Sequence, residues 1–215
     1  MQSELAEVIR FPLLAERVPA PPPAALDPVL DATEACIVRH GLAKTSLSDI
    51  ARELGVAPST VYRKVGTVEN AALLVMGRES HRLLAELPEV IAGVEGPRVI
   101  TVFLAASIER TASHPMAAKI LRDEIEWMGR LMTRRMDELL TEGVATVTPL
   151  LEAAMANGTI RRQDPEMLAH WIMRIGMTCL LAPPPGKLVD ALDALLLPML
   201  EPAPPTPKSA KRKRP

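Results

Sequence analysis

The sequence predicts an all-α protein, and three observations lead to that class. Apolar residues recur at helical spacing along most of the 215-residue chain, glycine or proline separates these stretches, and no stretch alternates with period two for long enough to form a strand. Hydrophobic residues make up 48% of the chain but aromatic residues only 2%. We therefore expect helices that pack through Leu, Ala, Val, Ile and Met side chains.

The sequence also argues against several classes of protein. The two cysteines, Cys36 and Cys179, lie far apart without a CxxC motif, which argues against a disulfide framework or zinc site and favours a reducing cytoplasm. No apolar run reaches about 18 residues and no signal-peptide pattern is present, so we expect no membrane association. Common catalytic and cofactor motifs are absent, and the four histidines fall on separate predicted helices. We expect no enzyme, metal or cofactor.

The chain begins with a proline-rich stretch and then changes character. Proline favours extended chain, so we expect residues 1–26 to be a mostly disordered arm. Asp27 followed by Pro28 predicts a helix with Asp27 as its N-cap, and Gly41 predicts the end of that helix.

Two shorter helices follow at close spacing. Ser46 and Asp49 have the spacing of a capping box, and Gly55 ends the helix that they begin. Pro58 opens another helix, for which Ala57 is a weak N-cap because it has no side-chain acceptor. We expect Ile50, Val56 and Val61 to close a small core shared by these helices.

The rest of the chain predicts a helical body. Helices are expected at 68–87, 97–113, 116–121, 123–156, 165–182 and 187–200. Pro149 should kink or split the long one, because proline removes a backbone donor. Residues 201–215 are rich in proline and then basic, which predicts a tail.

Residues 45–64 carry the functional signal. Two short helices around a glycine turn have the geometry that places one helix in the major groove of DNA, although an ordinary helical hairpin has the same pattern. Thr45 and Ser46 lie at a helix N-terminus, where hydroxyl and amide groups suit a phosphate oxygen.

A longer pattern resembles the N-terminal domain of the TetR family over about residues 27–75. The matching positions are Val29 to Ala32, Gly41, Thr45 and Ser46, Asp49 to Ala51, Gly55 and Val56, and Thr60 to Tyr62. The resemblance implies a three-helix DNA-binding domain with a helix-turn-helix, in which residues 58–64 form the recognition helix. The sequence departs from the family at Val65, Val68 and Ala71, where Phe, Lys and Leu are usual, and the change at Val68 puts one phosphate contact in question.

The resemblance also implies roles for residues of the recognition helix. Thr60 and Tyr62 occupy positions that contact the DNA backbone, although Tyr62 could instead be a packed core ring. Pro58, Ser59 and Arg63 occupy positions that face base edges, and Arg63 suits bidentate contact with guanine. Lys64 either contacts a phosphate or is a solvated charge.

The charge distribution bears on DNA affinity. Residues 27–82 contain seven basic and seven acidic residues, residues 83–207 contain 11 and 16, and residues 208–214 contain five basic residues and no acidic one. A neutral DNA-binding domain should have modest non-specific affinity, because that affinity scales with the phosphates neutralised. The basic tail either compensates or is a solubilising end.

The last two predicted helices are apolar over much of their circumference, which requires more than one burial partner. We expect a homodimer interface there, or else two buried helices of a monomeric core. The candidate interface residues are Leu168, Ile172, Ile175, Leu192, Leu195, Leu196 and Met199.

A stripe of apolar residues in the body suggests a pocket for an apolar small molecule, because methionine adapts to irregular surfaces. The candidates are Phe103, Ile108, Trp127, Met128, Leu131 and Met132. Simple core packing is the alternative for each of them.

Together these features predict four segments: an arm at 1–26, a DNA-binding domain at 27–70, a regulatory and dimerisation domain at 71–200, and a tail at 201–215. The expected function is a cytoplasmic repressor that binds an operator in double-stranded DNA and is released by an apolar ligand. A helix-turn-helix regulator with a filled body and no ligand is the alternative.

Overall fold

The structure, a computed structural model, describes residues 18–202. Within that range the chain forms eleven α-helices and one short 3-10 helix, and no strand, which confirms the predicted all-α class. The predictions for residues 1–17 and 203–215 lie outside the described part.

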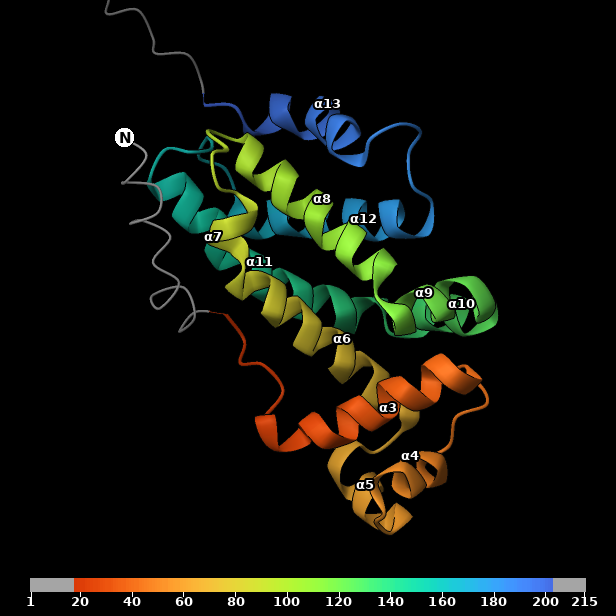
Figure 1. Cartoon of the computed structure of the whole chain (residues 1–215). Helices are drawn as coiled ribbons and strands as arrows, with labels where there is room; N and C mark the ends of the chain where they lie inside the picture. The colour runs from red at the N-terminus through yellow and green to blue at the C-terminus, as the bar shows by residue number, and fades with distance from the viewer. Residues whose placement is uncertain (1–17, 203–215) are drawn as a thin grey trace, which may run out of the picture.

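The described chain divides into a small three-helix domain and a larger body (Figure 1). The N-terminal domain consists of α3 (Asp27–His40), α4 (Leu47–Leu54) and α5 (Pro58–Val65). Helix α6 (Val68–Ala85) leads from this domain into the body.

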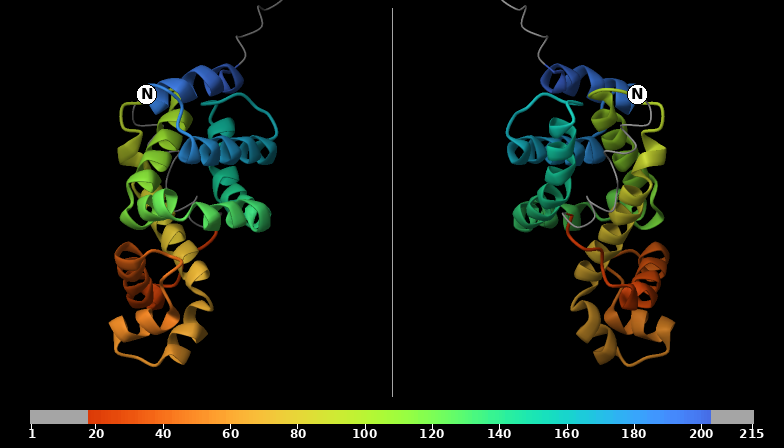
Figure 2. Two further views of the ribbon diagram at one scale, coloured as in Figure 1. Left: turned by 90° about the vertical axis from the view of Figure 1, so that its right-hand side faces the viewer. Right: turned by 90° about the vertical axis from the view of Figure 1, so that its left-hand side faces the viewer.

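The body is built from helices that follow α6. They are α7 (Leu87–Val90), α8 (Arg98–Ser113), α9 (Pro115–Asp123), α10 (Ile125–Arg134), α11 (Met136–Ala156), α12 (Pro165–Leu181) and α13 (Leu188–Leu200). Helix α12 packs on α11 and α8, and α13 packs on α8. Both views in Figure 2 show α13 at the end of the molecule that is remote from α4 and α5, with α12 beneath it.

Polar contacts help to hold α13 on α8. The Asp193 carboxylate of α13 accepts a hydrogen bond from the Arg98 side chain at 2.9 Å and another from the buried Thr101 hydroxyl of α8. These contacts satisfy a buried polar group that would otherwise destabilise the fold.

Three apolar clusters organise the fold. The N-terminal core joins α3, α4 and α5 to the start of α6 through Val29, Ala32, Cys36, Ile50, Ala51, Val61, Val65 and Ala71. The junction cluster joins α3 to α6, α9 and α10 through Leu30, Ile37, Leu42, Ala72, Val75, Met116, Ile120, Trp127 and Leu131. The body core, which includes Val144, Leu151, Leu168 and Leu196, fills the space between α8, α11, α12 and α13.

The start of α3 differs from the prediction. Asp27 is the first residue of the helix rather than its N-cap, and a short 3-10 helix (Ala24–Leu26) precedes it. The Asp27 carboxylate instead accepts a hydrogen bond from buried Arg78 at 3.2 Å. A tertiary ion pair thus replaces the local cap.

The last residues of the predicted arm have a defined structure. Residues 24–26 form the 3-10 helix, and the Lys64 side chain of α5 donates a hydrogen bond to the Ala25 carbonyl at 3.2 Å. This part of the arm is therefore attached to the N-terminal domain.

The long helix predicted at 123–156 is divided, but not at Pro149. The division falls at Arg135, whose φ of −125° and ψ of 10° lie outside the helical region, while α11 continues through the buried Pro149. Trp127 and Leu131 of α10 face the junction cluster, whereas Val144 and Leu151 of α11 face the body core. The division lets the two segments bury apolar faces in different clusters.

Among the described helices, only α11 is long and apolar enough to cross a membrane, judged by length and composition alone. In this structure it packs along α12, and its buried residues include Leu140, Val144 and Leu151. A core helix of a folded domain can have the same length and composition. Because α11 packs along α12 and buries these residues, it is a core helix of the body.

Two isoleucines provide a matched test of the junction cluster. Ile37 is fully buried there, whereas Ile125, at the start of α10, is 80% exposed. We expect Ile37→Ala to lower the free energy of unfolding by about 2–5 kcal/mol, because it leaves a cavity. Ile125→Ala should change it by less than about 0.5 kcal/mol. Urea unfolding measures both, and equal effects would contradict the cluster.

Candidate nucleic-acid interface

Helix α4 begins with the predicted capping box. The Ser46 hydroxyl accepts a hydrogen bond from the Asp49 amide at 3.2 Å, and the Asp49 carboxylate accepts from the Ser46 amide at 3.0 Å and hydroxyl at 2.6 Å. At the other end, Gly55 adopts a φ of 66° and a ψ of 31°, a left-handed conformation that glycine takes without strain. The local sequence thus fixes both ends of α4.

Helix α5 presents an open face. Its N-cap, Ala57, makes no side-chain cap, as predicted, and Pro58 is its first residue. Val61 and Val65 are buried in the N-terminal core, so the opposite side of the helix faces outward. Figure 1 shows α5 at the end of the molecule farthest from α13, where no part of the described body covers it.

The exposed face carries most of the residues predicted to contact DNA. Pro58, Ser59 and Arg63 are exposed, and Thr60 is partly buried. Tyr62 is 62% exposed, which rules out the alternative of a packed core ring in this structure. The face therefore offers hydroxyl and guanidinium groups on one side of a short helix.

Other predicted contacts have different surroundings. Thr45 is buried, and its hydroxyl donates a hydrogen bond to the Gly41 carbonyl at 2.7 Å. We therefore correct the expected phosphate contact of this hydroxyl, which instead holds the loop. The Ser46 hydroxyl is engaged in the capping box. Lys64, expected at a phosphate or in solvent, is exposed and donates a hydrogen bond to the Ala25 carbonyl.

The turn between α4 and α5 differs from expectation at Val56. This residue is 42% exposed rather than part of the shared core. Ala71, from the start of α6, joins Ile50 and Val61 in that core. The third side of this core thus comes from α6, which lies outside the helix-turn-helix. The local pattern of residues 45–64 does not reveal that contact.

Ion pairs hold some of the basic residues of this domain. Arg39 of α3 pairs with Glu53 of α4 at 3.0 Å, and Arg52 pairs with Asp49 at 3.0 Å. Within residues 18–202, Arg63 and Lys44 make no ion pair. Lys44 is exposed two residues before the cap of α4, and sequence reasoning missed it although its position beside Thr45 and Ser46 gave the signal.

Comparison with known proteins agrees with this geometry. Residues 29–64, which span α3 to α5, match the family model of bacterial regulatory proteins of the tetR family. These residues are thus similar to the N-terminal domain of tetR-family regulators. A relative from Mycobacterium bovis, named as an uncharacterized HTH-type transcriptional regulator, is 24% identical over 78% of this chain and 83% of its own length. The comparisons thus confirm the resemblance inferred from sequence.

Two solved tetR-family structures are similar in fold along most of the chain. The repressor AlkX from Dietzia sp. has a TM-score of 0.61 at 19% identity, covering 80% of this chain and 92% of AlkX. A regulator from Pectobacterium atrosepticum has a TM-score of 0.59 at 18% identity, covering 81% of this chain and 94% of the regulator. These relatives are named as transcriptional regulators or repressors.

The predicted ligand-pocket residues do not share one cavity. Trp127 and Leu131 are buried in the junction cluster, with Met128 and Met132 packed against it, whereas Ile108 belongs to the body core. Phe103 is partly buried on α8. The pocket prediction is therefore corrected: α10 turns its stripe toward α3, away from the body core that receives Ile108.

An open cavity of about 370 Å³ lies elsewhere in the body, between α8, the end of α12 and the segment that leads to α13. Its lining is mainly apolar and includes one predicted residue, Ile108. The lining residues are Ile108, Glu109, Ala112, Cys179, Leu180, Pro183, Gly186, Lys187, Leu188 and Val189.

The predicted dimer residues separate into two groups. Leu168, Ile172, Leu192 and Leu196 are buried in the body core of one chain, so their expected place in a dimer interface is corrected. Leu195 is 53% exposed, Met199 is exposed and Ile175 is partly buried. Met167 and Trp171 of α12, which the predicted set omitted, are also exposed. Within one chain, α8 packs on both helices and α11 packs on α12, so these helices provide burial that the sequence suggested a second chain would provide.

The capping box predicts a pH dependence of stability. Hydrogen bonds from the Ser46 side chain and backbone, with a contribution from Arg52, hold the pKa of Asp49 below its ordinary value. Because the folded pKa is lowered, the stabilisation is present above the unfolded pKa of about 3.9. It is lost as the pH falls through the folded value.

We therefore expect wild type to be more stable than Asp49→Asn near neutral pH, and the difference to shrink as the pH falls toward about 3. Urea unfolding at several pH values measures this difference. Asp137→Asn, at an exposed position in the first turn of α11, is the control. A difference that stays constant with pH would contradict the account.

Proposed function

We propose that this chain represses transcription by binding an operator in double-stranded DNA as a homodimer, and that an apolar small molecule releases it. The supporting observation is the outward face of α5, opposite buried Val61 and Val65. In this proposal Thr60 and Tyr62 contact phosphates, and Pro58, Ser59 and Arg63 contact base edges. The amides at the start of α4 and the side chain of Lys44 add phosphate contacts.

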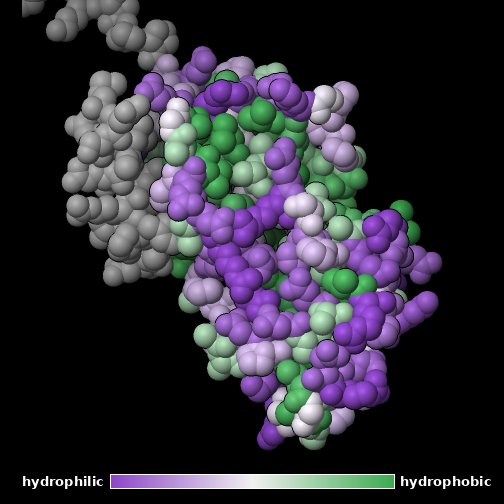
Figure 3. Space-filling model, in the orientation of Figure 1, coloured by the Kyte–Doolittle hydropathy of each residue, from purple (hydrophilic) through white to green (hydrophobic). Residues whose placement is uncertain are grey.

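Homodimerisation is supported by apolar side chains that remain exposed on the last two helices. Helices α12 and α13 both pack on α8 and make little contact with each other. Trp171 on α12 and Leu195 on α13 are each 53% exposed. Figure 3 shows hydrophobic surface over α13 and the start of α8, whereas the end formed by α4 and α5 is more hydrophilic.

A second copy of the chain would cover these side chains. Operator binding by a two-fold dimer requires its two copies of α5 to lie about 34–36 Å apart, which is the spacing of successive major grooves.

Release by a ligand is supported by the cavity beside α8 and by the continuity of α6 from body to N-terminal domain. A ligand that binds the DNA-bound and released conformations with different affinity shifts the population between them.

A regulator without a ligand is the second candidate, favoured by the dense packing of Trp127 and Leu131. A thermal-shift screen with apolar compounds distinguishes the two. For both candidates we propose a cytoplasmic location, because the operator DNA lies there.

The DNA contacts are tested by Tyr62→Phe and Arg63→Ala. We expect Arg63→Ala to weaken operator binding about five- to 150-fold, since a bidentate contact with guanine contributes about 1–3 kcal/mol of discrimination. Tyr62→Phe should weaken binding less, through loss of one phosphate hydrogen bond. Gel-shift titration on DNA fragments retained by the purified protein measures both.

Arg130→Ala is the control for this test, because Arg130 is an exposed arginine on α10 of the body. Binding by Arg63→Ala that equals wild type would refute the assignment of α5.

The dimer is tested by charged substitutions on its proposed surface. We expect Trp171→Asp and Leu195→Asp to shift the protein to monomer in sedimentation, because a carboxylate buried against apolar surface is strongly unfavourable. Ile125→Asp, at an exposed isoleucine on α10, should leave the oligomeric state unchanged. Wild type that sediments as a monomer would show the proposed assembly to be wrong.

A further inference from the structure

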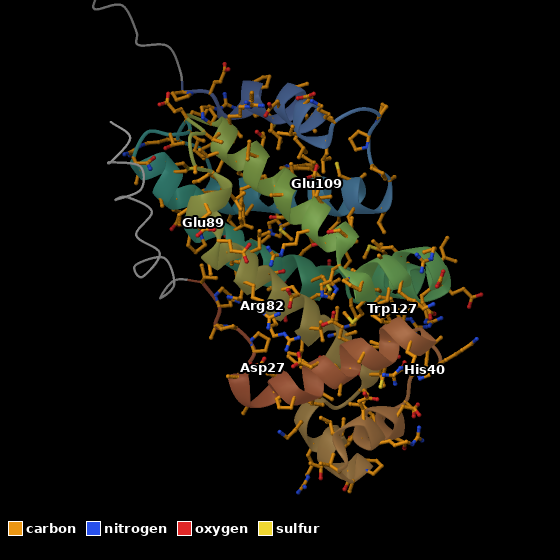
Figure 4. All side chains as sticks on the ribbon, in the orientation of Figure 1. Asp27, His40, Arg82, Glu89, Glu109 and Trp127 are labelled. Carbon is orange, nitrogen blue, oxygen red and sulfur yellow. The ribbon has the colours of Figure 1, made fainter. Side chains whose placement is uncertain are left out.

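Helix α3 is fixed to the body near both of its ends, by different polar contacts. Near its start, the Arg78 side chain of α6 is 7% exposed and lies 2.7 Å from Asp31 and 3.2 Å from Asp27. Beyond its end, the loop to α4 meets the corner between α9 and α10. Figure 4 shows Asp27 beside α6 at one end of α3 and Trp127 above the other end, near His40.

The contact at the second end is made by Glu124. Its carboxylate oxygen Oε1 accepts a hydrogen bond from the Ala43 amide at 3.2 Å. The neighbouring Leu42 is buried in the junction cluster with Ile120 and Trp127, which flank Glu124 in sequence. The loop is thus held to the corner by one apolar and one polar contact.

Gly41 makes this approach possible. A Cβ atom at residue 41 would lie 2.7 Å from Glu124 Oε1, closer than real Cβ contacts. The φ of Gly41 is 85°, which side-chain-bearing residues rarely adopt. The backbone conformation therefore favours glycine at residue 41, and a Cβ atom there would also displace the Glu124 carboxylate from the loop.

Glu124 itself is fixed by both helices of the corner. Its φ of −122° and ψ of 45° break the helix between α9 and α10. Its amide donates to the Ile120 carbonyl of α9 at 3.0 Å, and its carbonyl accepts from the Met128 amide of α10 at 3.0 Å. A displacement of either helix would therefore move the Glu124 carboxylate.

The loop is stiff enough to transmit such a displacement. The Thr45 hydroxyl donates to the Gly41 carbonyl at 2.7 Å, and the Thr45 amide donates to the Leu42 carbonyl at 3.2 Å. The next residue, Ser46, is the N-cap of α4. Only two residues separate Ala43 from that cap.

We propose that Glu124 is a positioning residue for DNA binding. It fixes the α3–α4 loop, and with it the start of α4 and the side chain of Lys44, in the orientation that binds the operator. Movement of the α9–α10 corner breaks the hydrogen bond to Ala43 and lowers operator affinity. This inference rests on the proposed function, since it assigns a role only within operator binding.

The test compares four variants by fluorescence anisotropy on an operator fragment retained by the wild-type protein. Glu124→Ala removes the acceptor, and Glu124→Asp keeps the charge but is one methylene too short to reach Ala43. We expect both to bind about three- to tenfold more weakly, because an amide left without its partner loses its fixed position. Glu124→Gln keeps an oxygen acceptor at the same reach and should bind within about twofold of wild type.

Glu126→Ala is the matched control, because Glu126 is an exposed glutamate two residues further along α10. Thermal unfolding of each variant separates binding from stability, and Glu124→Asp keeps the test valid if Glu124→Ala does not fold. Hydrogen exchange at residues 42–45 should be faster in Glu124→Ala and Glu124→Asp, and unchanged in Glu124→Gln and Glu126→Ala.

Two results would overturn the inference while the proposed function stands. One is operator binding by Glu124→Asp equal to wild type, and the other is a loss in Glu124→Gln as large as in Glu124→Asp. Absence of DNA binding by the wild-type protein would overturn the proposed function itself, and the inference with it.

Discussion

The structure depends on the burial of α3 on two sides. Val29 and Cys36 lie in the N-terminal core against α4 and α5, whereas Leu30 and Ile37 lie in the junction cluster against α6, α9 and α10. A helix that is apolar on more than one face requires more than one partner. Because α3 serves both clusters, α5 cannot change its orientation relative to the body without a change in one of them. The position of the proposed DNA-binding face is therefore a consequence of core packing.

The sequence predicted features that depend on neighbouring residues. Ser46 and Asp49 form a capping box through contacts that need only the first turn of α4. Gly55 ends α4 and Pro58 begins α5 through their own backbone preferences. Asp27, Thr45 and Val56 were assigned by the same local reasoning, yet distant contacts or the shape of a turn decided their surroundings. The Asp27 carboxylate accepts a hydrogen bond from Arg78, which is 51 residues away in sequence, and does not cap its own helix. Local signals located the helices of the site, and tertiary contacts decided which side chains face outward.

In the body, too, the sequence pattern predicted buried faces but not the contacts that bury them. Apolar residues around much of α12 and α13 indicated several burial partners, but the pattern did not say which partner covers which residue. In the structure α8 covers Leu192 and Leu196, and it leaves Leu195 uncovered on the same helix. Likewise, the stripe on α10 predicted apolar surroundings correctly, although its partner is α3 rather than a ligand. Periodicity identifies a buried face, whereas the identity of the partner depends on contacts between residues far apart in the chain.

The charges of the N-terminal domain give the junction its functional importance. Arg39 and Arg52 are held in ion pairs, Lys64 binds a backbone carbonyl, and Lys44 and Arg63 remain without ion pairs in the described part of the chain. Non-specific DNA affinity scales with the number of phosphates neutralised, so two such side chains contribute little of it. Operator recognition must then depend on the accurate placement of a few contacts rather than on general attraction. In the proposed complex, a rotation of the N-terminal domain would displace these few contacts from their phosphates and bases, so contacts at the junction with the body would control operator binding.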